Sequence, residues 1–319
     1  MSAPFCRASV VVLALASAAS PACAAFFGSG EDQFSIEFVP IGSPGNSFDQ
    51  RGAPRFSGSV AYEYSIAKFE VSERAVRAAN ELGGLGITLD ERGPDKPATS
   101  VTWIEAARFV NWLNEDRGFF PAYKFTEIAT PIDPRQPTSE FEPWEIGDPG
   151  FNPANPFRNR RANYFLPSID EWYKAAYYDP VGESYFASTT SSDADPIPVA
   201  SGTDPGTAVF RQFEATDGPA DVMLAGGESP FGVVGLGGNI DEWNDVESVF
   251  FPLGRRPARG GAWGSPAGVL RSTAAGTLLA TSEGDNVGFR VVSLGIPEPT
   301  AIALVILGLS VLPHRLRSH

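Results

Sequence analysis

The residues with the clearest capacity for chemistry are carboxylates clustered in one short stretch, Asp241, Glu242, Asp245 and Glu247. Two carboxyl groups at the right separation are sufficient for glycoside hydrolysis. The chain contains 38 Asp and Glu against 24 Lys and Arg, so clusters of this kind also arise by chance. The stretch is one candidate for a catalytic site, in an enzyme that uses carboxylates or a metal with oxygen ligands.

Thiols and imidazoles occur only near the two ends of the chain, as Cys6, Cys23, His314 and His319. Residues 1–24 combine a short polar start, an apolar run over 8–19 and the small residues Ala22-Cys23-Ala24. This is the pattern of a secretory signal peptide. The alternative is a lipoprotein with Cys23 as the lipidated residue, although Ser20 and Pro21 are poor residues before such a cysteine.

The C-terminal residues 296–319 contain Pro297-Glu298-Pro299, an apolar run over 301–312 and a basic end. A helix of that run would rise about 18 Å, short of the roughly 30 Å hydrocarbon core. The order closely resembles the PEP-CTERM sorting tail. That resemblance implies an exosortase as partner and delivery to the envelope, surface or extracellular matrix of a Gram-negative bacterium; a C-terminal hydrophobic anchor is the alternative.

Removal of both ends would leave a chain without cysteine or histidine, which excludes Cys/His zinc sites and Ser-His-Asp catalysis. The formal charge of −14 argues against nucleic acid as a partner. Arg158, Arg160 and Arg161 form a small basic cluster. We interpret it as loop solvation or pairing with carboxylates, with an anion site as the alternative.

Blocks that combine glycine, a large aromatic residue and a charged residue follow one another between residues 231 and 292. They are Gly238-Asn239-Ile240-Asp241-Glu242-Trp243, Arg259-Gly260-Gly261-Ala262-Trp263, Leu270-Arg271-Ser272 and Gly288-Phe289-Arg290. In order and spacing these blocks resemble the formylglycine-generating enzyme (sulfatase-modifying factor) family. Upstream blocks at 68–72, 97–113 and 165–176 extend the resemblance to about residues 36–293.

The resemblance implies an α+β, C-type-lectin-like fold, rich in loops and formed as a single domain over residues 25–295. It places the family's two copper-binding catalytic cysteines near Ser265 and Leu270. Neither residue is a thiol, and a soft metal such as Cu(I) requires a thiolate. We therefore expect no copper and no catalytic residues, unless another arrangement replaces the cysteines in a formylglycine-generating-like oxidase.

The resemblance also implies a structural calcium site at Gly238, Ile240 and Glu242, the first two through backbone carbonyls, which are hard oxygen ligands. The chain departs from the family at Gly235, where Asp or Asn is usual. The alternative is that Glu242 pairs with a buried arginine such as Arg271 or Arg290.

Local patterns predict the elements that carry these residues. Alternation predicts strands over 34–41 and 60–66. Capping residues predict helices from Ser72 to Leu82, from Thr102 to about Asp116 and from Ser168 through Tyr177. The Pro-rich segment 126–163 is predicted to be an ordered insertion over the core rather than a linker, and 179–227 mostly loop.

We predict an exported, surface- or matrix-associated, non-catalytic member of the family that binds a polysaccharide or an envelope protein. The alternatives are the carboxylate or metal enzyme, the oxidase, and a structural spacer with neither ligand nor activity.

Overall fold

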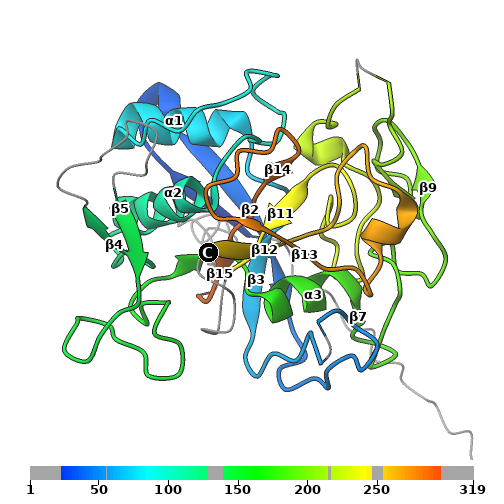
Figure 1. Cartoon of the computed structure of the whole chain (residues 1–319), viewed down its shortest axis with the longest axis horizontal. Coiled ribbons are helices and arrows are strands. Elements are labelled where there is room, and N and C mark those ends of the chain that lie inside the picture. Colours follow the sequence, from blue (N-terminus) through cyan, green and yellow to red (C-terminus); the bar gives the residue numbers. More distant parts are fainter. Residues whose placement is uncertain (1–22, 55, 128–138, 215–216, 246–253, 296–319) are drawn as a thin grey trace, which may run out of the picture.

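The computed structural model describes residues 23–54, 56–127, 139–214, 217–245 and 254–295 (Figure 1). The predicted tail and all but the last residues of the predicted leader lie outside this range. Within it, one α+β domain is built on two sheets with three α-helices packed around them, as the family resemblance predicts. None of the described helices is long and apolar enough to cross a membrane.

The larger sheet has five antiparallel strands in the order β1-β2-β3-β15-β6. Their bounds are Cys23–Phe27, Phe34–Ile41, Tyr64–Ala67, Val292–Ser293 and Tyr164–Phe165. The last strand of the domain, β15, therefore lies between β3 and β6, which closes the fold on itself. The strand predicted over 34–41 is confirmed.

The strand predicted over 60–66 begins later, at Tyr64. The reason is the side chain of Asn46, which donates to the carbonyl of Gly58 at 2.7 Å and accepts from the amide of Val60 at 3.2 Å. These bonds hold the residues before Tyr64 in a loop, because a side-chain amide competes with the ladder for backbone groups.

The smaller sheet has four strands in the order β13-β12-β11-β14. Their bounds are Gly276–Leu279, Arg255–Arg259, Asp241–Trp243 and Val287–Gly288. The pairing of β11 with β14 is parallel and the other two are antiparallel. Glu242 lies opposite both Arg259 and Gly288, so this sheet brings together three blocks that are far apart in the sequence.

The helices begin where the capping residues predict. α1 spans Glu73–Gly83, α2 Trp103–Asp116 and α3 Ile169–Tyr177. Thr102 and Ser168 each complete a capping box with the glutamate three residues later. Figure 1 shows α1 and α2 lying together on one flank, with α3 on the other side of β3. Trp103 and Trp172, carried by α2 and α3, are fully buried core anchors.

The remaining elements are short. β4 (Lys124–Glu127) pairs with β5 (Ser139–Glu142), β7 (Tyr178–Asp179) with β8 (Ser184–Tyr185), and β9 (Ile197–Pro198) with β10 (Thr207–Ala208). Turns of 3-10 helix cover Gly30–Asp32, Val222–Leu224 and Ala267–Leu270. The segment 179–227 is thus mostly loop with small strands, as predicted.

The described part of the Pro-rich insertion is ordered over the core. Phe141 contacts Trp103 with ring centroids 4.9 Å apart, and Phe157 stacks on Phe141 at 5.7 Å. Trp144 donates its indole N–H to the carbonyl of Ala122 at 3.1 Å. The aromatic side chains therefore attach the described part of this segment to Trp103 of α2 and to the loop that follows this helix.

The capping box of α2 gives a stability prediction. Thr102→Ala removes the acceptor for the amide of Glu105, which lies 3.1 Å from the hydroxyl. We expect a loss of about 1 kcal/mol in the free energy of unfolding. Thr102→Ser, which keeps the hydroxyl, is the control in urea denaturation. Equal destabilisation by the two substitutions would contradict the role of the cap.

Candidate functional site

A buried ion pair joins two of the glycine- and aromatic-containing blocks, between Glu242 on β11 and Arg290 just after β14. The guanidinium donates to both carboxylate oxygens, at 2.6 Å from Nε and 2.5 Å from Nη2, and neither side chain is exposed. Trp172 of α3 donates its indole N–H to the same carboxylate at 2.7 Å. The prediction that Glu242 pairs with a buried arginine is confirmed for Arg290. It is wrong for Arg271, which pairs instead with Asp195 near the surface.

A second carboxyl group, Glu70, lies beside this pair. Burial, followed by the charge of Glu242, holds the pKa of Glu70 well above its usual range. Asn239 donates its amide to Oε2 of Glu70 at 2.8 Å, whereas Oε1 has no hydrogen-bond partner among the described residues. A Cβ atom on Gly235 would lie 3.0 Å from that Oε1. Glu70 therefore occupies the space that an Asp or Asn side chain at position 235 would need.

Of the predicted calcium ligands, Glu242 belongs to this pair. The Glu242 carboxylate already accepts from Arg290 and Trp172, so an ion bound through it must share the carboxylate with the guanidinium or replace it. The backbone carbonyl of Ile240 lies beside Gly260, as does that of Leu236. A Cβ atom on Gly260 would be 3.6 Å from the first oxygen and 2.9 Å from the second. Calcium at Gly238, Ile240 and Glu242 stays a prediction.

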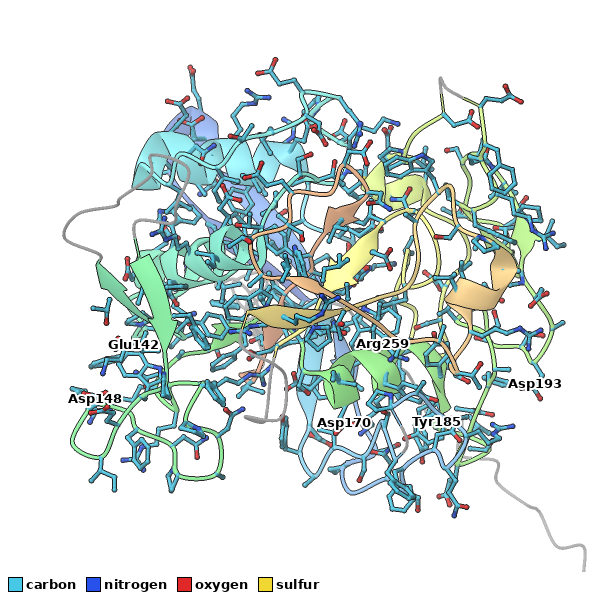
Figure 2. All side chains as sticks on the ribbon, in the orientation of Figure 1. Glu142, Asp148, Asp170, Tyr185, Asp193 and Arg259 are labelled. Carbon is cyan, nitrogen blue, oxygen red and sulfur yellow. The ribbon has the colours of Figure 1, made fainter. Side chains whose placement is uncertain are left out.

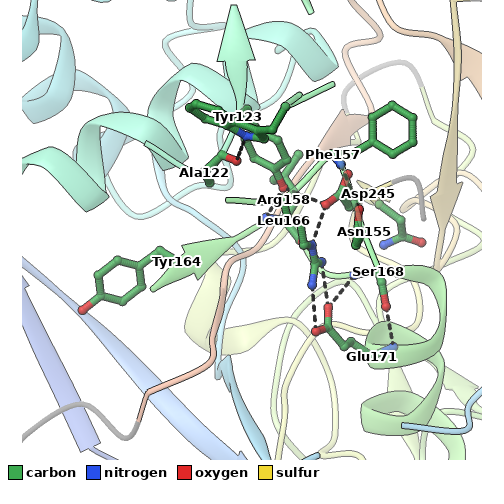
Figure 3. A network of polar contacts seen from close by, with 12 residues as sticks. Ala122, Tyr123, Asn155, Phe157, Arg158, Tyr164, Leu166, Ser168, Glu171 and Asp245 are labelled. Atoms are coloured by element: carbon green, nitrogen blue, oxygen red, sulfur yellow. Dashed lines mark hydrogen bonds and ion pairs between the residues drawn. The ribbon is translucent and has the colours of Figure 1, made fainter. Parts of the chain in front are cut away.

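Asp245 belongs to a second buried ion pair, centred on Arg158 of the insertion (Figure 3). Arg158 donates to Asp245 at 2.7 Å and, through two nitrogens, to Glu171 of α3 at 3.0 and 2.9 Å. Tyr123 adds a hydroxyl bond to Asp245 at 3.0 Å. Burial acts to raise the pKa of Glu171, but the charge and hydrogen bonds of Arg158 lower it below its usual range.

The three arginines of the basic cluster, Arg158, Arg160 and Arg161, have different environments. Arg158 is 5% exposed and paired with carboxylates, so loop solvation is wrong for this residue and pairing is right. Arg160 and Arg161 are exposed, and the guanidinium of Arg161 lies 4.9 Å from the ring centroid of Phe120.

The described carboxylates of the proposed catalytic cluster all hold backbone or side-chain groups in place. Asp241 accepts from the amide of Gly261 at 2.9 Å, and burial raises its pKa. Glu242 and Asp245 are the buried ion-pair partners described above. Glu247 lies outside the described residues. The arrangement therefore gives Asp241, Glu242 and Asp245 structural roles, and none of the three lines the polar cavity described below.

The arginine of the Arg-Gly-Gly block, Arg259, lies over α3 (Figure 2). Its guanidinium is 5.4 Å from the ring centroid of Trp172 and 5.1 Å from that of Tyr173. It donates to the carbonyl of Ala53, and burial lowers its pKa. This residue connects the 46–58 loop to β12 and α3.

The positions expected for the family's cysteines lie together. A Cβ atom on Gly261 would be 3.0 Å from Cδ1 of Leu270 and 3.3 Å from Cβ of Ser265. Leu270 is buried in a small apolar cluster with Ala208, Phe210 and Ala267. The Ser265 hydroxyl accepts from the amide of Ala262 at 2.9 Å. An alcohol and an alkyl chain cannot form the thiolates that Cu(I) chemistry requires.

A polar cavity of about 520 Å³ lies beside these positions. It is lined by Arg92, Lys96, Ala200, Ser201, Gln212 and the run 217–221. Backbone bonds run from this lining toward Ser265: the amide of Gln212 donates to the carbonyl of Trp263 at 2.8 Å, and the amide of its neighbour Arg211 donates to that of Ser265 at 3.1 Å. Sequence reasoning missed this cavity, because its residues come from segments without a shared motif.

The two sheets, the three helices and the loop-rich connections between them describe an α+β domain of the kind that the family resemblance predicts. The chain belongs to the sulfatase-modifying factor enzyme 1-like domain family, whose model matches residues 42–294. No curated protein matches the sequence.

Solved structures support the same fold. Treponema denticola variable protein 1 superposes with a TM-score of 0.54 at 17% identity, covering 85% of this chain and 99% of that one. CarF gives a TM-score of 0.53 at 19% identity, over 81% and 98% of the two chains. PvdO from Pseudomonas aeruginosa gives 0.50 at 17% identity, over 86% and 99%. At these identities the likeness concerns the fold alone.

The Arg158 network gives a matched pair of variants. Arg158→Met leaves two buried carboxylates without their cation, and we expect a loss of about 3–5 kcal/mol in the free energy of unfolding. Arg160→Met changes an exposed neighbour and should stay within about 0.5 kcal/mol of the wild type. Similar losses in the two variants, measured by urea denaturation, would contradict the assignment of Arg158 to the core.

The raised pKa of Glu70 predicts a pH dependence with a definite sign. Above the ordinary Glu value of 4.5, the unfolded chain ionises this group while the folded chain keeps its proton. Stability should therefore fall as pH rises, until the folded pKa is reached, by up to about 1.4 kcal/mol per pH unit. Glu70→Gln should flatten this slope in urea denaturation series between pH 5 and 9. An unchanged slope would show that Glu70 is ionised in the fold.

Proposed function

We propose that this protein is an exported, non-catalytic member of its family that binds a polysaccharide or an envelope protein at the cell surface or in the extracellular matrix. The observation that carries the proposal is the pairing of a polar cavity with the absence of thiols beside it. The family resemblance places the family's cysteines near Ser265 and Leu270, and Arg211, the neighbour of Gln212 in the cavity lining, donates its amide to the carbonyl of Ser265.

The export part of the proposal rests on the two ends of the sequence. The signal-peptide pattern of residues 1–24 supports export, and the tail over 296–319 supports recognition by an exosortase-type sorting enzyme of a Gram-negative envelope. The predicted cleavage signal overlaps β1, where Cys23 and Ala24 pair with Phe38 and Glu37. Cleavage after Ala24 would keep Ala25, Phe26 and Phe27 of this strand.

Structural roles for the described carboxylates support binding rather than hydrolysis. A general acid and a general base must face a substrate and exchange protons with it. Glu242 and Asp245 instead have no exposed surface and accept from arginines. Their role is to stabilise the fold. The polar cavity remains as the site where a ligand binds.

Co-sedimentation of the purified protein with the exopolysaccharide of the producing organism tests this function. We expect saturable binding of the intact polymer and no change in its chain length after incubation. A Glu242→Gln variant that remains folded should bind as well as the wild type. Depolymerisation that this variant abolishes would instead identify an enzyme, and no binding to polymer or envelope extract would favour a structural spacer.

Thermal unfolding of the protein in calcium and in EDTA tests the metal prediction. An ion present at one hundred times its Kd stabilises the folded state by about 2.7 kcal/mol. A melting temperature that is higher in calcium than in EDTA would support a site at Gly238 and Ile240. Equal melting temperatures would contradict it and leave Arg290 and Trp172 as the partners of Glu242.

A further inference from the structure

The charges that line the cavity balance one another. Arg92 and Lys96 supply two positive charges, and Asp217 and Asp221 supply two negative charges. A ligand site for an anion needs positive charge in excess of what the protein itself neutralises. The lining has no such excess, and the whole chain carries −14, which further disfavours an anionic ligand.

Both cations are moreover engaged by groups of the protein. Lys96 donates to the carbonyl of Pro219 at 2.9 Å and lies 3.0 Å from Oδ1 of Asp221. Lys96 is therefore held against the wall of the cavity by two acceptors. An anionic ligand would have to compete with both of them for the ammonium group.

Arg92 is held in a similar way. It lies 3.1 Å from Oδ2 of Asp90 and donates to the hydroxyl of Thr99 at 2.5 Å. Its guanidinium also lies 5.2 Å from the ring centroid of Trp263. Trp263 also accepts a backbone hydrogen bond from Gln212. Arg92 and Gln212, both in the cavity lining, are therefore held by the same residue.

The other polar groups of the cavity suit hydroxyl groups. Gln212 donates its side-chain nitrogen to the carbonyls of Phe210 and Val199, at 3.0 and 3.3 Å, which leaves its oxygen as an acceptor. Asp217 accepts from the amide of Glu214 through Oδ2, and its second oxygen adds another acceptor. Ser201 adds a hydroxyl that donates and accepts. A polyol, whose hydroxyls also both donate and accept, complements this set.

The floor of the cavity is fixed by the core. Asn239 accepts from the amide of Ala220 at 2.7 Å, and its own amide donates to Glu70 at 2.8 Å. The residue has a left-handed backbone conformation, with φ of 59°. Since the floor is held by a buried side chain, the cavity exists before a ligand arrives, and its volume lies within the range of about 300–1,000 Å³ typical of small-molecule sites.

We propose that this cavity binds an uncharged, hydroxyl-rich ligand, a neutral hexose unit of a glycan, and discriminates against acidic sugars. The inference rests on the proposed binding function and names its ligand class. Gln212 and Asp217 accept from sugar hydroxyls, and Arg92, held by Trp263, forms one side of the site.

Isothermal titration of the full-length protein with neutral glucan oligosaccharides and with oligogalacturonates tests the proposal. We expect binding of the neutral oligosaccharides and at least tenfold weaker binding of the acidic ones. Gln212→Ala should weaken neutral binding at least tenfold, and Ser201→Trp should abolish it by filling the cavity while removing no hydrogen bond described above. Glu142→Gln on β5 is the control and should bind normally, because β5 lies on the opposite side of the molecule from β9, which Ala200 and Ser201 of the cavity follow in the chain (Figures 1 and 2).

Tighter binding of oligogalacturonates, or neutral binding that survives both cavity variants, would overturn the proposal. The co-sedimentation assay separates these failures from failure of the binding function. Binding of the polymer that does not depend on Gln212 or Ser201 would contradict this ligand assignment and leave the function standing. Absence of polymer binding by the folded wild-type protein would contradict both.

Discussion

The buried pair of Glu242 and Arg290 is the interaction on which the rest of the fold depends. The glutamate belongs to the smaller sheet, while Arg290 also donates to the carbonyl of Ala67 at the end of β3 in the larger sheet. A further bond runs to the carbonyl of Val234, before the Gly-Gly-Asn turn. Burying two charges is costly unless every lone pair and N–H finds a partner. The exact complement of acceptors around Arg290 therefore favours one relative position of the two sheets.

The buried ion pairs of Arg158 with Glu171 and Asp245 fix the insertion to the core in the same way. Arg158 comes from the insertion, Glu171 from the start of α3 and Asp245 from the end of β11. Glu171 also completes the capping box of α3 by accepting from the amide of Ser168 at 2.7 Å. One carboxylate thus begins a helix and anchors an insertion. A loop-rich domain without a disulfide among its described residues gains order from such shared contacts.

Local patterns in the sequence predicted the helices well, because a capping box is complete within four residues and needs no distant partner. The late start of β3 could not be read in this way, since Asn46 acts on residues that are distant in the chain. The same limit applies to the site. Glu242 was correctly connected to an arginine, but only the fold distinguishes Arg290 from Arg271. The cavity was missed because Arg92, Gln212 and Asp217 meet only in three dimensions.

The domain keeps the framework of its family while an alcohol and an alkyl chain stand where copper-binding thiols are expected. In this framework, Asn239 and Glu70 hold the floor of the cavity in place through the amide of Ala220. These bonds do not depend on the residues at positions 265 and 270. Fold by itself does not define function, and the features that favour binding are the polar cavity and its balanced charges.

A crystal structure of the protein grown with a neutral oligosaccharide tests the central claim most directly. The account predicts electron density for a sugar ring in the cavity, within hydrogen-bond distance of Gln212 and Asp217, with Glu242 still paired to Arg290. A sugar bound elsewhere on a surface with the cavity empty, or a polymer cleaved at the carboxylates of β11, would contradict it.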